Sequence, residues 1–455
     1  YIMVKRKGAV VHSIPYEFPL DRHFYGQTFV IGDHVRHSDL KTGVYSHSAD
    51  SIKNTEFGDL QRTVARDRFG TDLVLAQDSF SSVPKKTLDT SRTPLFPYLD
   101  ARLSEGPVAF DAHYFRSGHY PEFDELRAKY GKNIPFFIHL HCLSGLFLGN
   151  LNVQELSHRQ KIIRDNLLRV IDTHDPSIIA VSDAVRDSFY QHGMVPNGKI
   201  TVVRNGIDVD MYHAASEKEK ADFRKGLGIN ASRLVGYVGR LEDVKGADVL
   251  AAILERHEDI GRDVGYVIAA TDGKLMVPFI ERMKRRVPKL LEEGKLKFCV
   301  DVSKFTGGFY GRDSKVCQYF AELAANSAFG QTENGFVDVI TEPLHRHLDV
   351  YLHPSKSEAL GLSVVEASMS EVPVVASNIG GIPEVINPNA GTLVDIVDRP
   401  HSDIVHDFVF ATRHHLDSPI APEISANNRK NLIRTGFDAR RMAAELDQLY
   451  VPNRR

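Results

Sequence analysis

Short apolar runs alternate along this sequence with longer amphipathic stretches. Such alternation is typical of strands joined by helices in a parallel sheet, so it predicts an α/β fold. The expected strands of the first half, in chain order, are residues 8–13, 73–75, 108–111, 136–140 and 177–181. A second series follows at residues 234–238, 264–270 and 348–352. Two series predict two Rossmann-like domains, in which ligands bind beyond the carboxyl ends of the strands.

The length of 455 residues also favours two domains, because a single hydrophobic core rarely grows beyond about 250–300 residues. The stretch AASEKEKADFR at residues 214–224 is strongly charged and marks the predicted boundary. We expect domains at residues 1–213 and 214–425, then a helical segment at 426–455, for which packing back on the first domain is one option. Residues 274–338 are expected to be a long irregular connection, either a lid or an insertion.

Basic and acidic residues nearly balance, with 56 Lys and Arg against 59 Asp and Glu and a formal charge of -3. A chain without a broad basic field is not expected to bind nucleic acid. No apolar run approaches the roughly 20 residues of a membrane-spanning helix, so no integral membrane segment is expected. Three scattered cysteines, Cys142, Cys299 and Cys317, are too few for a disulfide framework, which favours a reducing compartment and predicts a cytoplasmic protein. Homo-oligomerisation stays open.

The longest motif is PSKSEALGLSVVEASMSEVPVVAS, at residues 354–377. It predicts a strand end, a tight turn, a helix and a second strand. Glu358 lies in the turn and Glu366 follows on the helix, while Gly361 at the helix start leaves backbone N–H groups open to a ligand. Ionised carboxylates accept hydrogen bonds from sugar hydroxyls in definite directions. Two glutamates at this spacing alone are more often solvated on a surface helix, so the complete string carries the prediction.

A second motif, LVGYVGRLEDVKG at residues 234–246, is an apolar strand followed by Arg240 and Lys245. Two cations converging on a diphosphate leaving group would stabilise the charge that develops as its bond to the sugar breaks. The alternative is a solvated basic pair at the end of a strand. In the first half, Gly26 follows the first strand, where a small residue lets the backbone approach a phosphate.

Two more segments, FDAHYFRSG at residues 110–118 and IPFFIHLHCLSG at 134–145, are apolar strands that end in histidine. Histidine and cysteine are zinc ligands, so a metal site at His139, His141 and Cys142 has to be considered. Adjacent residues of a strand point to opposite faces, and we therefore predict no metal site there. The plain alternative for each histidine is a core side chain satisfied by hydrogen bonds.

These motifs resemble glycosyltransferase family 4. Residues 354–377 are similar to its donor-binding signature, in which two glutamates flank a glycine turn before a Pro-Val-Val-Ala strand, and residues 234–246 are similar to its Gly-Arg-x4-Lys-Gly segment. The loop of Gly26 and the two histidine segments look like those of the sucrose-phosphate-synthase branch, with a tyrosine where that branch often has a second glycine. Residues 179–188 and 202–208 resemble the segments just before the interdomain crossing.

The resemblance implies a GT-B fold, with two Rossmann-like domains whose parallel sheets face an interdomain cleft. It places the acceptor side in the N-terminal domain and the donor side in the C-terminal domain. The implied reaction is the transfer of a sugar, with retention, from a nucleoside-diphosphate sugar to a small-molecule or glycan acceptor. No metal and no cofactor are implied.

The resemblance also assigns roles to single residues. Glu358 would contact the donor sugar and Glu366 the ribose hydroxyls, while His141 takes the place of the active-site histidine, with His139 as the competing alignment. The residues implied in catalysis are His141, Arg240, Lys245 and Glu358. The residues implied in donor binding are Gly26, Gly239, Arg240, Lys245, Glu358, Ala359, Leu360, Gly361, Leu362 and Glu366.

The sequence leaves three rival functions to consider. A nucleotide-sugar epimerase or hydrolase would use the same donor contacts without an acceptor. A dinucleotide-dependent oxidoreductase is disfavoured because no Gly-x-Gly-x-x-Gly follows an early strand. A partner subunit without activity is disfavoured because both glutamates and both cations are present.

Overall fold

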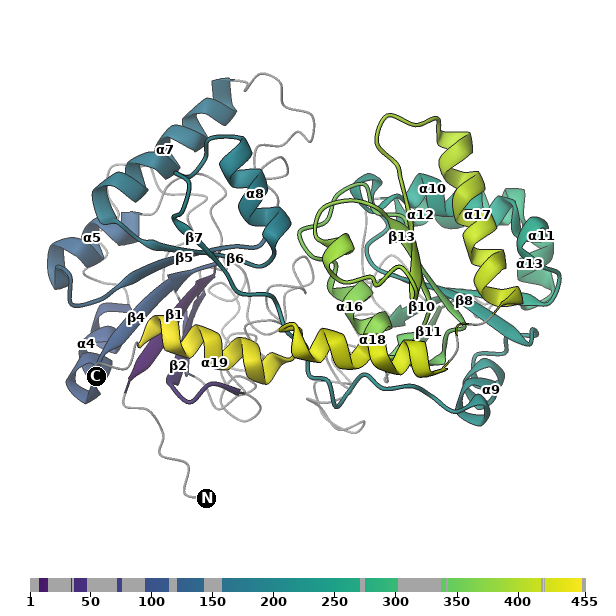
Figure 1. Cartoon of the computed structure of the whole chain (residues 1–455), viewed down its shortest axis with the longest axis horizontal. Helices are drawn as coiled ribbons and strands as arrows, with labels where there is room; N and C mark the ends of the chain where they lie inside the picture. Colours follow the sequence, from purple (N-terminus) through teal and green to yellow (C-terminus); the bar gives the residue numbers. More distant parts are fainter. Residues whose placement is uncertain are drawn as a thin grey trace. The chain divides into compact units, whose positions relative to one another are not determined.

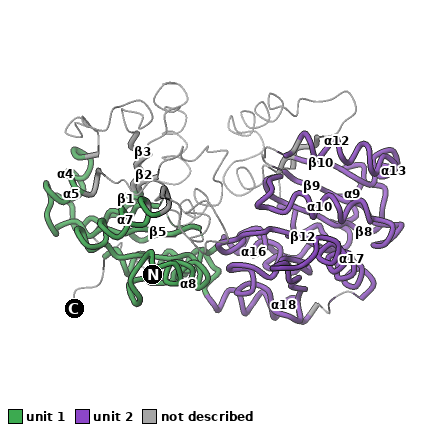
Figure 2. The backbone as a smooth tube through the Cα atoms, turned by 90° about the horizontal axis from the view of Figure 1, so that it is seen from above, with its two compact units in different colours: residues 1–206, 436–455 green, residues 207–435 purple. Residues whose placement is uncertain are grey.

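The computed structural model describes two compact units (Figure 2). Unit 1 comprises Tyr1–Gly206 and Gly436–Arg455, and unit 2 comprises Ile207–Thr435. The predicted boundaries were at 213/214 and 425/426. The first observed boundary lies a few residues earlier than predicted, and the second lies about ten residues later. The described residues are 8–14, 34, 37–46, 72–75, 95–113, 121–142, 158–270, 275–301, 337–340, 343–418, 420 and 422–451.

Unit 1 contains a parallel sheet of seven strands in the order β3-β2-β1-β4-β5-β6-β7 (Figure 1). Its strands are β1 (Ala9–Ile14), β2 (Lys41–Ser46), β3 (Asp72–Leu75), β4 (Val108–Ala112), β5 (Phe136–Leu140), β6 (Ser177–Ala180) and β7 (Ile200–Val202). Its helices are α4 (Leu95–Glu105), α5 (Pro121–Tyr130), α7 (His158–His174), α8 (Asp183–Gln191) and α19 (Ala439–Tyr450). The five strands predicted in this half are confirmed, and β2 was missed because KTGVYS has no apolar run.

Unit 2 contains a second parallel sheet, in the order β11-β10-β9-β8-β12-β13-β14. Its strands are β8 (Arg233–Val238), β9 (Val264–Ala269), β10 (Leu296–Asp301), β11 (Val337–Ile340), β12 (Val350–His353), β13 (Val374–Ser377) and β14 (Gly391–Val394). Its helices are α9 (Glu217–Gly226), η2 (Asp243–Lys245), α10 (Ala247–Glu255), α11 (His257–Ile260), α12 (Met276–Arg286), α13 (Pro288–Glu292), η3 (Leu344–His347), α16 (Leu362–Met369), η4 (Ile382–Glu384), α17 (His401–Asp417) and α18 (Pro422–Arg434). The predicted α/β class is confirmed.

The expectation of an irregular connection at residues 274–338 is wrong for its first part. Residues 275–301 form α12, α13 and the strand β10, which pairs with β9 and β11. The local sequence hides these elements because lysines, arginines and glutamates surround a strand of only six residues. Residues 302–336 lie outside the described part of the chain.

Buried apolar side chains explain why the strands of both sheets form where they do. In unit 2, Leu250 of α10, Tyr266 of β9 and Phe408 of α17 belong to one buried cluster. In unit 1, every residue of β4 and β5 is buried, as expected for central parallel strands covered on both faces. Among the described helices, none is at once long and apolar enough to cross a bilayer.

The last helix, α19, packs on the first sheet. The ring of Tyr450 contacts that of Phe137 in β5, with centroids 4.9 Å apart and an interplanar angle of 88°. Met442 and Leu446 on the same helix are also buried. Unit 1 is therefore completed by residues that the chain supplies only at its C-terminal end.

Candidate functional site

The two loops that follow β8 and β12 are joined by backbone contacts. These strands are neighbours in the sheet, so their carboxyl ends meet at one edge. Gly246 has φ +70°, and a Cβ at this position would lie 1.9 Å from the carbonyl oxygen of Pro354. The N–H of Lys356 donates to the carbonyl of Val244 at 2.9 Å. Only glycine allows this close approach, which brings Lys245 to the second loop.

Lys245 and Glu358 form an ion pair where these loops meet. The distance from Lys245 Nζ to Glu358 Oε1 is 2.5 Å. The same oxygen accepts hydrogen bonds from His353 Nε2 at 2.8 Å and Ser355 Oγ at 3.0 Å. Tyr351 OH lies 3.1 Å from Nδ1 of His353 and holds the ring in place. His353 and Ser355 were missed, although both lie within five residues of Glu358 in the sequence.

Glu358 is ionised although it is buried. Burial alone would raise the pKa of its carboxyl group, but Lys245 and His353 together hold this pKa well below its ordinary value. A buried carboxylate with three donors on one oxygen is a preorganised acceptor of hydrogen bonds. This is the property that binding of a sugar hydroxyl requires.

Arg240 lies on the first loop but in a different ion pair. Its Nη1 is 3.1 Å from Glu242 Oε2, and its side chain is half-exposed. Its carbonyl accepts a hydrogen bond from Tyr237 OH at 2.8 Å. At Gly239, which precedes it, a Cβ would lie 3.0 Å from that hydroxyl oxygen. Arg240 is thus anchored through its backbone while its guanidinium is still within reach of solvent.

The loop after β12 ends at Gly361, which has φ +86° and precedes α16. Gly381 packs against this loop, since its N–H faces the carbonyl of Glu358 at 3.4 Å and a Cβ there would lie 2.3 Å from the carbonyl oxygen of Ala359. Leu360 is buried and Leu362 begins the helix. The predicted strand, turn, helix and strand over 354–377 are all present.

Glu366 is on α16, where it belongs to a separate cluster. It is 1 % exposed, and its Oε2 lies 3.6 Å from Nδ1 of His345 in η3. The structure therefore gives each glutamate its own basic neighbour, Lys245 for Glu358 and His345 for Glu366. His345 was not predicted, because it precedes β12 and lies outside the motif.

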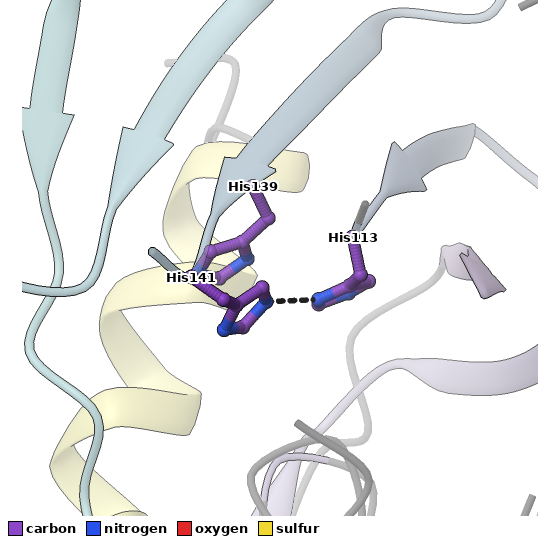
Figure 3. Close-up of side chains that lie close together, drawn as sticks. All are labelled: His113, His139 and His141. Atoms are coloured by element: carbon purple, nitrogen blue, oxygen red, sulfur yellow. Dashed lines mark hydrogen bonds between the residues drawn. The ribbon is translucent and has the colours of Figure 1, made fainter. Parts of the chain in front are cut away.

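In unit 1, the rings of His113, His139 and His141 lie together at the ends of β4 and β5 (Figure 3). The dashed line in Figure 3 joins His113 Nδ1 to His141 Nε2, which are 2.8 Å apart. Asp111, buried in β4, accepts from His139 Nδ1 at 3.2 Å and lies 3.2 Å from His113 Nε2. Its Oδ2 also accepts a short hydrogen bond from Tyr450 OH.

A chain of hydrogen bonds continues from His113 into the core of unit 1. His113 Nε2 is 2.8 Å from His12 Nδ1, and His12 Nε2 is 3.0 Å from His34 Nδ1. His34 Nε2 is 3.1 Å from Oδ1 of Asp447 on α19. His12 and His34 are both buried. Of the residues joined by these hydrogen bonds, the sequence motifs pointed only to His113 and His141.

Two protein-family models match parts of the chain. Residues 82–211 match the family model described as Glycosyltransferase Family 4, and residues 335–402 match the model described as Glycosyl transferases group 1. The first match covers the histidine segments and the second covers the motif with both glutamates.

Curated relatives match about half of the chain. A D-inositol 3-phosphate glycosyltransferase of Corynebacterium glutamicum is 26% identical over 234 residues, which are 50% of this chain and 47% of that protein. An alpha-maltose-1-phosphate synthase of Mycolicibacterium smegmatis is 27% identical over 212 residues, 46% of each chain. The chain thus spans about half the length of the curated relatives it matches.

Solved structures match over nearly the whole length. Sucrose-phosphate synthase of Thermosynechococcus elongatus has a TM-score of 0.62 at 17% identity and covers 98% of both chains. HepE of Anabaena, solved with UDP and glucose, has a TM-score of 0.60 at 17% identity and covers 97% of this chain and 98% of its own. The chain has the GT-B fold. Its two matched regions are similar to glycosyltransferase domains, as the sequence motifs predicted.

Two groups of side chains in unit 1 lie close enough to one another to be considered as metal ligands. One ring nitrogen from each of His113, His139 and His141 lies within 4.8 Å of the others, and His12, Asp111 and His113 form a second such group. The rings of His139 and His141 are stacked, with centroids 4.5 Å apart and an interplanar angle of 17°. Lone pairs lie in the ring planes, so stacked rings direct them side by side and not toward one ion.

The expectation that these strand-end side chains point to opposite faces is wrong for the two histidines. His139 and His141 are two residues apart at the end of one strand, and their rings lie on the same side with His113 as the third member. Cys142 is not in the group, and burial raises the pKa of its thiol to about 12. Gly26 and its loop lie outside the described residues.

Proposed function

We propose that this chain is a retaining glycosyltransferase that moves a sugar from a nucleoside-diphosphate sugar to a small-molecule or glycan acceptor. The observation that carries the proposal is the ion pair of Lys245 with Glu358 at the carboxyl ends of β8 and β12. A cation suited to a diphosphate and a carboxylate suited to sugar hydroxyls lie in contact where parallel sheets bind their ligands.

Donor binding requires Lys245 to exchange its carboxylate partner for the diphosphate. His353 and Ser355 still donate to Glu358 after this exchange, so the carboxylate keeps two hydrogen bonds and accepts others from the sugar. Arg240, half-exposed on the same loop, supplies the second cation. Both cations act on charge that grows as the sugar leaves, which is where an interaction increases the rate.

The remaining donor contacts are proposed for the backbone and for Glu366. The backbone N–H groups from Ala359 to Leu362 lie at the start of α16, where the helix dipole favours phosphate and sugar oxygens. Glu366 would accept hydrogen bonds from the ribose hydroxyls, and Gly26 is proposed as a further donor-binding residue.

The chemical step is a displacement on one face of the sugar. The bond between the anomeric carbon and the diphosphate oxygen breaks, and the acceptor oxygen bonds to the same carbon on the same face. The acceptor proton passes to the departing phosphate oxygen, so neither a metal nor a cofactor is required. His141 would hold a sugar hydroxyl during this step.

The donor assignment is tested by comparing UDP with UMP in calorimetry. Lys245→Ala is expected to weaken UDP binding by about 10- to 100-fold, because a hydrogen bond to a charged group contributes about 1.5–3 kcal/mol. Binding of UMP, which lacks the second phosphate, is expected to change little. GDP and ADP are measured in the same way, since the base is still to be identified.

Lys356→Ala is the matched control. This lysine lies on the same loop, but its ammonium group pairs with Asp243 and Asp248. It is expected to leave the ratio of UDP to UMP affinity unchanged. If none of the three nucleoside diphosphates bound, or if both variants behaved alike, the donor site would be wrongly assigned.

Independence from metal is tested with the same protein. Transfer is expected to continue at the same rate after treatment with EDTA and after addition of Mg²⁺ or Mn²⁺. Loss of activity with EDTA and recovery with one ion would contradict the proposal. The three scattered cysteines of the sequence support a further proposal, that the protein acts in a reducing compartment such as the cytoplasm.

The names of the relatives suggest which acceptors to test first. The inositol phosphate, maltose phosphate and sucrose phosphate enzymes are all named for phosphorylated small molecules. A phosphorylated sugar or polyol is therefore the first acceptor class to offer, with UDP-glucose as donor. Thiols and glycans follow.

A nucleotide-sugar epimerase or hydrolase is the second candidate, because it would use the same Lys245 and Glu358. Product analysis separates the two. A transferase releases UDP in proportion to the glycosylated acceptor, whereas a hydrolase releases free sugar at the same rate whether or not an acceptor is present.

A further inference from the structure

We infer that two buried carboxylates of unit 1, Asp111 and Asp447, fix His141 in a single neutral tautomer that carries its proton on Nε2 and leaves the Nδ1 lone pair open. Both carboxylates are positioning residues, because they act on His141 through other histidines. The inference rests on the proposed function only for its activity readout, since the tautomer can be measured directly.

The first constraint comes from Asp447. Burial would raise the pKa of this carboxyl group, but hydrogen bonds from His34, Ser38 and the backbone of Asp39 lower it below its usual value. An ionised carboxylate only accepts, so His34 Nε2 must carry a proton. A His34 ring with one proton then has its lone pair on Nδ1, where it accepts from His12 Nε2 at 3.0 Å.

The second constraint comes from Asp111, and it places the proton of His12 on the same nitrogen. Asp111 Oδ2 lies 3.2 Å from His113 Nε2, and its negative charge favours a proton on this nitrogen. His113 Nε2 then donates to His12 Nδ1, 2.8 Å away, so the lone pair of His12 is on Nδ1. The proton of neutral His12 is then on Nε2, as Asp447 independently requires.

The series of hydrogen bonds ends at His141. Burial lowers the pKa of His113, and burial together with neighbouring histidines lowers that of His141 well below its usual value, so each ring carries one proton. The proton of His113 is on Nε2, and its Nδ1 therefore accepts from His141 Nε2 at 2.8 Å. His141 Nδ1 is left with the lone pair. His141 is half-buried, whereas His113, His12 and His34 are buried.

Asp111 fixes His139 in the same way. His139 Nδ1 donates to Asp111 at 3.2 Å, which leaves the lone pair on Nε2. Within the described part of the chain this buried nitrogen has no hydrogen-bond partner. His141, whose ring stacks on that of His139, is the half-buried member, and the lone pair on its Nδ1 accepts a hydrogen bond from a hydroxyl group and repels a phosphate oxygen.

The direct test is a long-range proton–nitrogen correlation spectrum of the full chain with ¹⁵N-labelled histidine. His141 is assigned by the signals that disappear in His141→Gln. We expect one nitrogen of His141 at a protonated shift and the other at a lone-pair shift, both constant between pH 8 and pH 6. Equal intermediate shifts, the opposite tautomer or a doubly protonated ring would overturn the inference.

Asp111→Asn and Asp447→Asn test the cause. The asparagine amide both donates and accepts, so it no longer imposes one direction on the chain. Each variant is expected to move the two nitrogen shifts of His141 toward each other, and the double variant is expected to move them further. Unchanged shifts in well-folded variants would overturn the role of the carboxylates. If Asp111→Asn does not fold, Asp447→Asn and the wild-type spectrum still decide.

Tyr450→Phe is the matched control. It removes a hydrogen bond to Asp111 from the same helix as Asp447, but it leaves both carboxylates in place. Stability is expected to fall while the tautomer of His141 stays the same. A change of tautomer in this variant would show that any loosening of the core has the effect, and would overturn the assignment.

The activity readout follows from the tautomer. If half of the molecules carry the other tautomer, kcat/KM for transfer is expected to fall about twofold. Only molecules with the lone pair on His141 Nδ1 would accept the hydrogen bond from the sugar hydroxyl. UDP binding is expected to stay constant, since the cations proposed to hold its diphosphate, Arg240 and Lys245, are in unit 2. A wild type without transferase activity would contradict the proposed function and leave the spectrum as the test of the tautomer.

Discussion

At the residue scale, Glu358 combines burial, ionisation and three donors on one oxygen. Glu358→Gln keeps the shape but removes the charge that orders Lys245 and His353. We expect kcat/KM for sugar transfer to fall about 10- to 100-fold, which corresponds to about 1.5–3 kcal/mol of lost interaction. Glu293→Gln, in the surface pair with Lys295, is the control and is expected to have wild-type activity.

Gly246 is the residue on which the junction of the two loops depends. Gly246→Ala is expected to abolish UDP binding and to destabilise unit 2, because a Cβ cannot fit 1.9 Å from the Pro354 oxygen. Gly228→Ala separates this clash from backbone strain, since Gly228 has φ +65° but its nearest neighbour would be 3.6 Å from a Cβ. It is expected to lose only about 1–2 kcal/mol of stability and to bind UDP normally. Similar UDP affinity in both variants would contradict the role of the contact.

At the scale of elements, α19 is the helix that completes unit 1. Leu446→Ala is expected to lower the free energy of unfolding of unit 1 by about 2–5 kcal/mol, because the side chain is 1% exposed and its loss leaves a cavity. Hydrogen exchange of the β4 and β5 amides measures the change. Gln448→Ala, at an exposed position of α19, is expected to have little effect. Unchanged protection of β4 and β5 in Leu446→Ala would contradict the packing role of α19.

The elements also explain which sites the sequence could reveal. The motif at residues 354–377 is one strand, turn, helix and strand, so the local sequence contains most of its contacts. Lys245 and Glu358 are 113 residues apart, yet each lies directly after a predicted strand of the same sheet. His353 was missed because it closes an apolar strand and has no counterpart in the motif.

At the scale of the whole molecule, the buried histidines make stability depend on pH. Burial lowers the pKa of His12 to about 3 and also lowers those of His113 and His141. As the pH falls below 6.5, the unfolded chain takes up protons at these positions before the folded chain does, and His12 stays unprotonated in the folded chain to about pH 4. Stability is therefore expected to fall with pH in this window, by up to about 1.4 kcal/mol per pH unit for each group.

Urea unfolding at pH 7.5, 6.5 and 5.5 measures this dependence. Asp111 and Asp447 act in the same direction at lower pH, because their pKa values are lowered by folding and their contribution is lost as they are protonated. The far-ultraviolet spectrum is the control for a folded starting state at each pH. Constant or rising stability from pH 7.5 to 5.5 would show that the three histidines are not neutral in the folded chain.

The sequence by itself determined the α/β class and most strands, and its motifs predicted the GT-B fold and the loops that carry Arg240, Lys245 and Glu358. It could do so because strand periodicity and a contiguous turn before a helix are local properties of the chain. It gave no sign of β2, whose sequence is polar, or of the elements in residues 275–301, which charged residues surround.

Only the tertiary structure decided how the histidines are used. The cluster unites His12, His34, Asp111, His113 and His141 with α19, and the bond from His34 to Asp447 spans 413 residues. Each of these side chains, taken alone, is compatible with an ordinary buried polar residue. Which nitrogen carries a proton depends on which acceptor lies opposite it, and that is set by the packing of distant segments and not by local sequence.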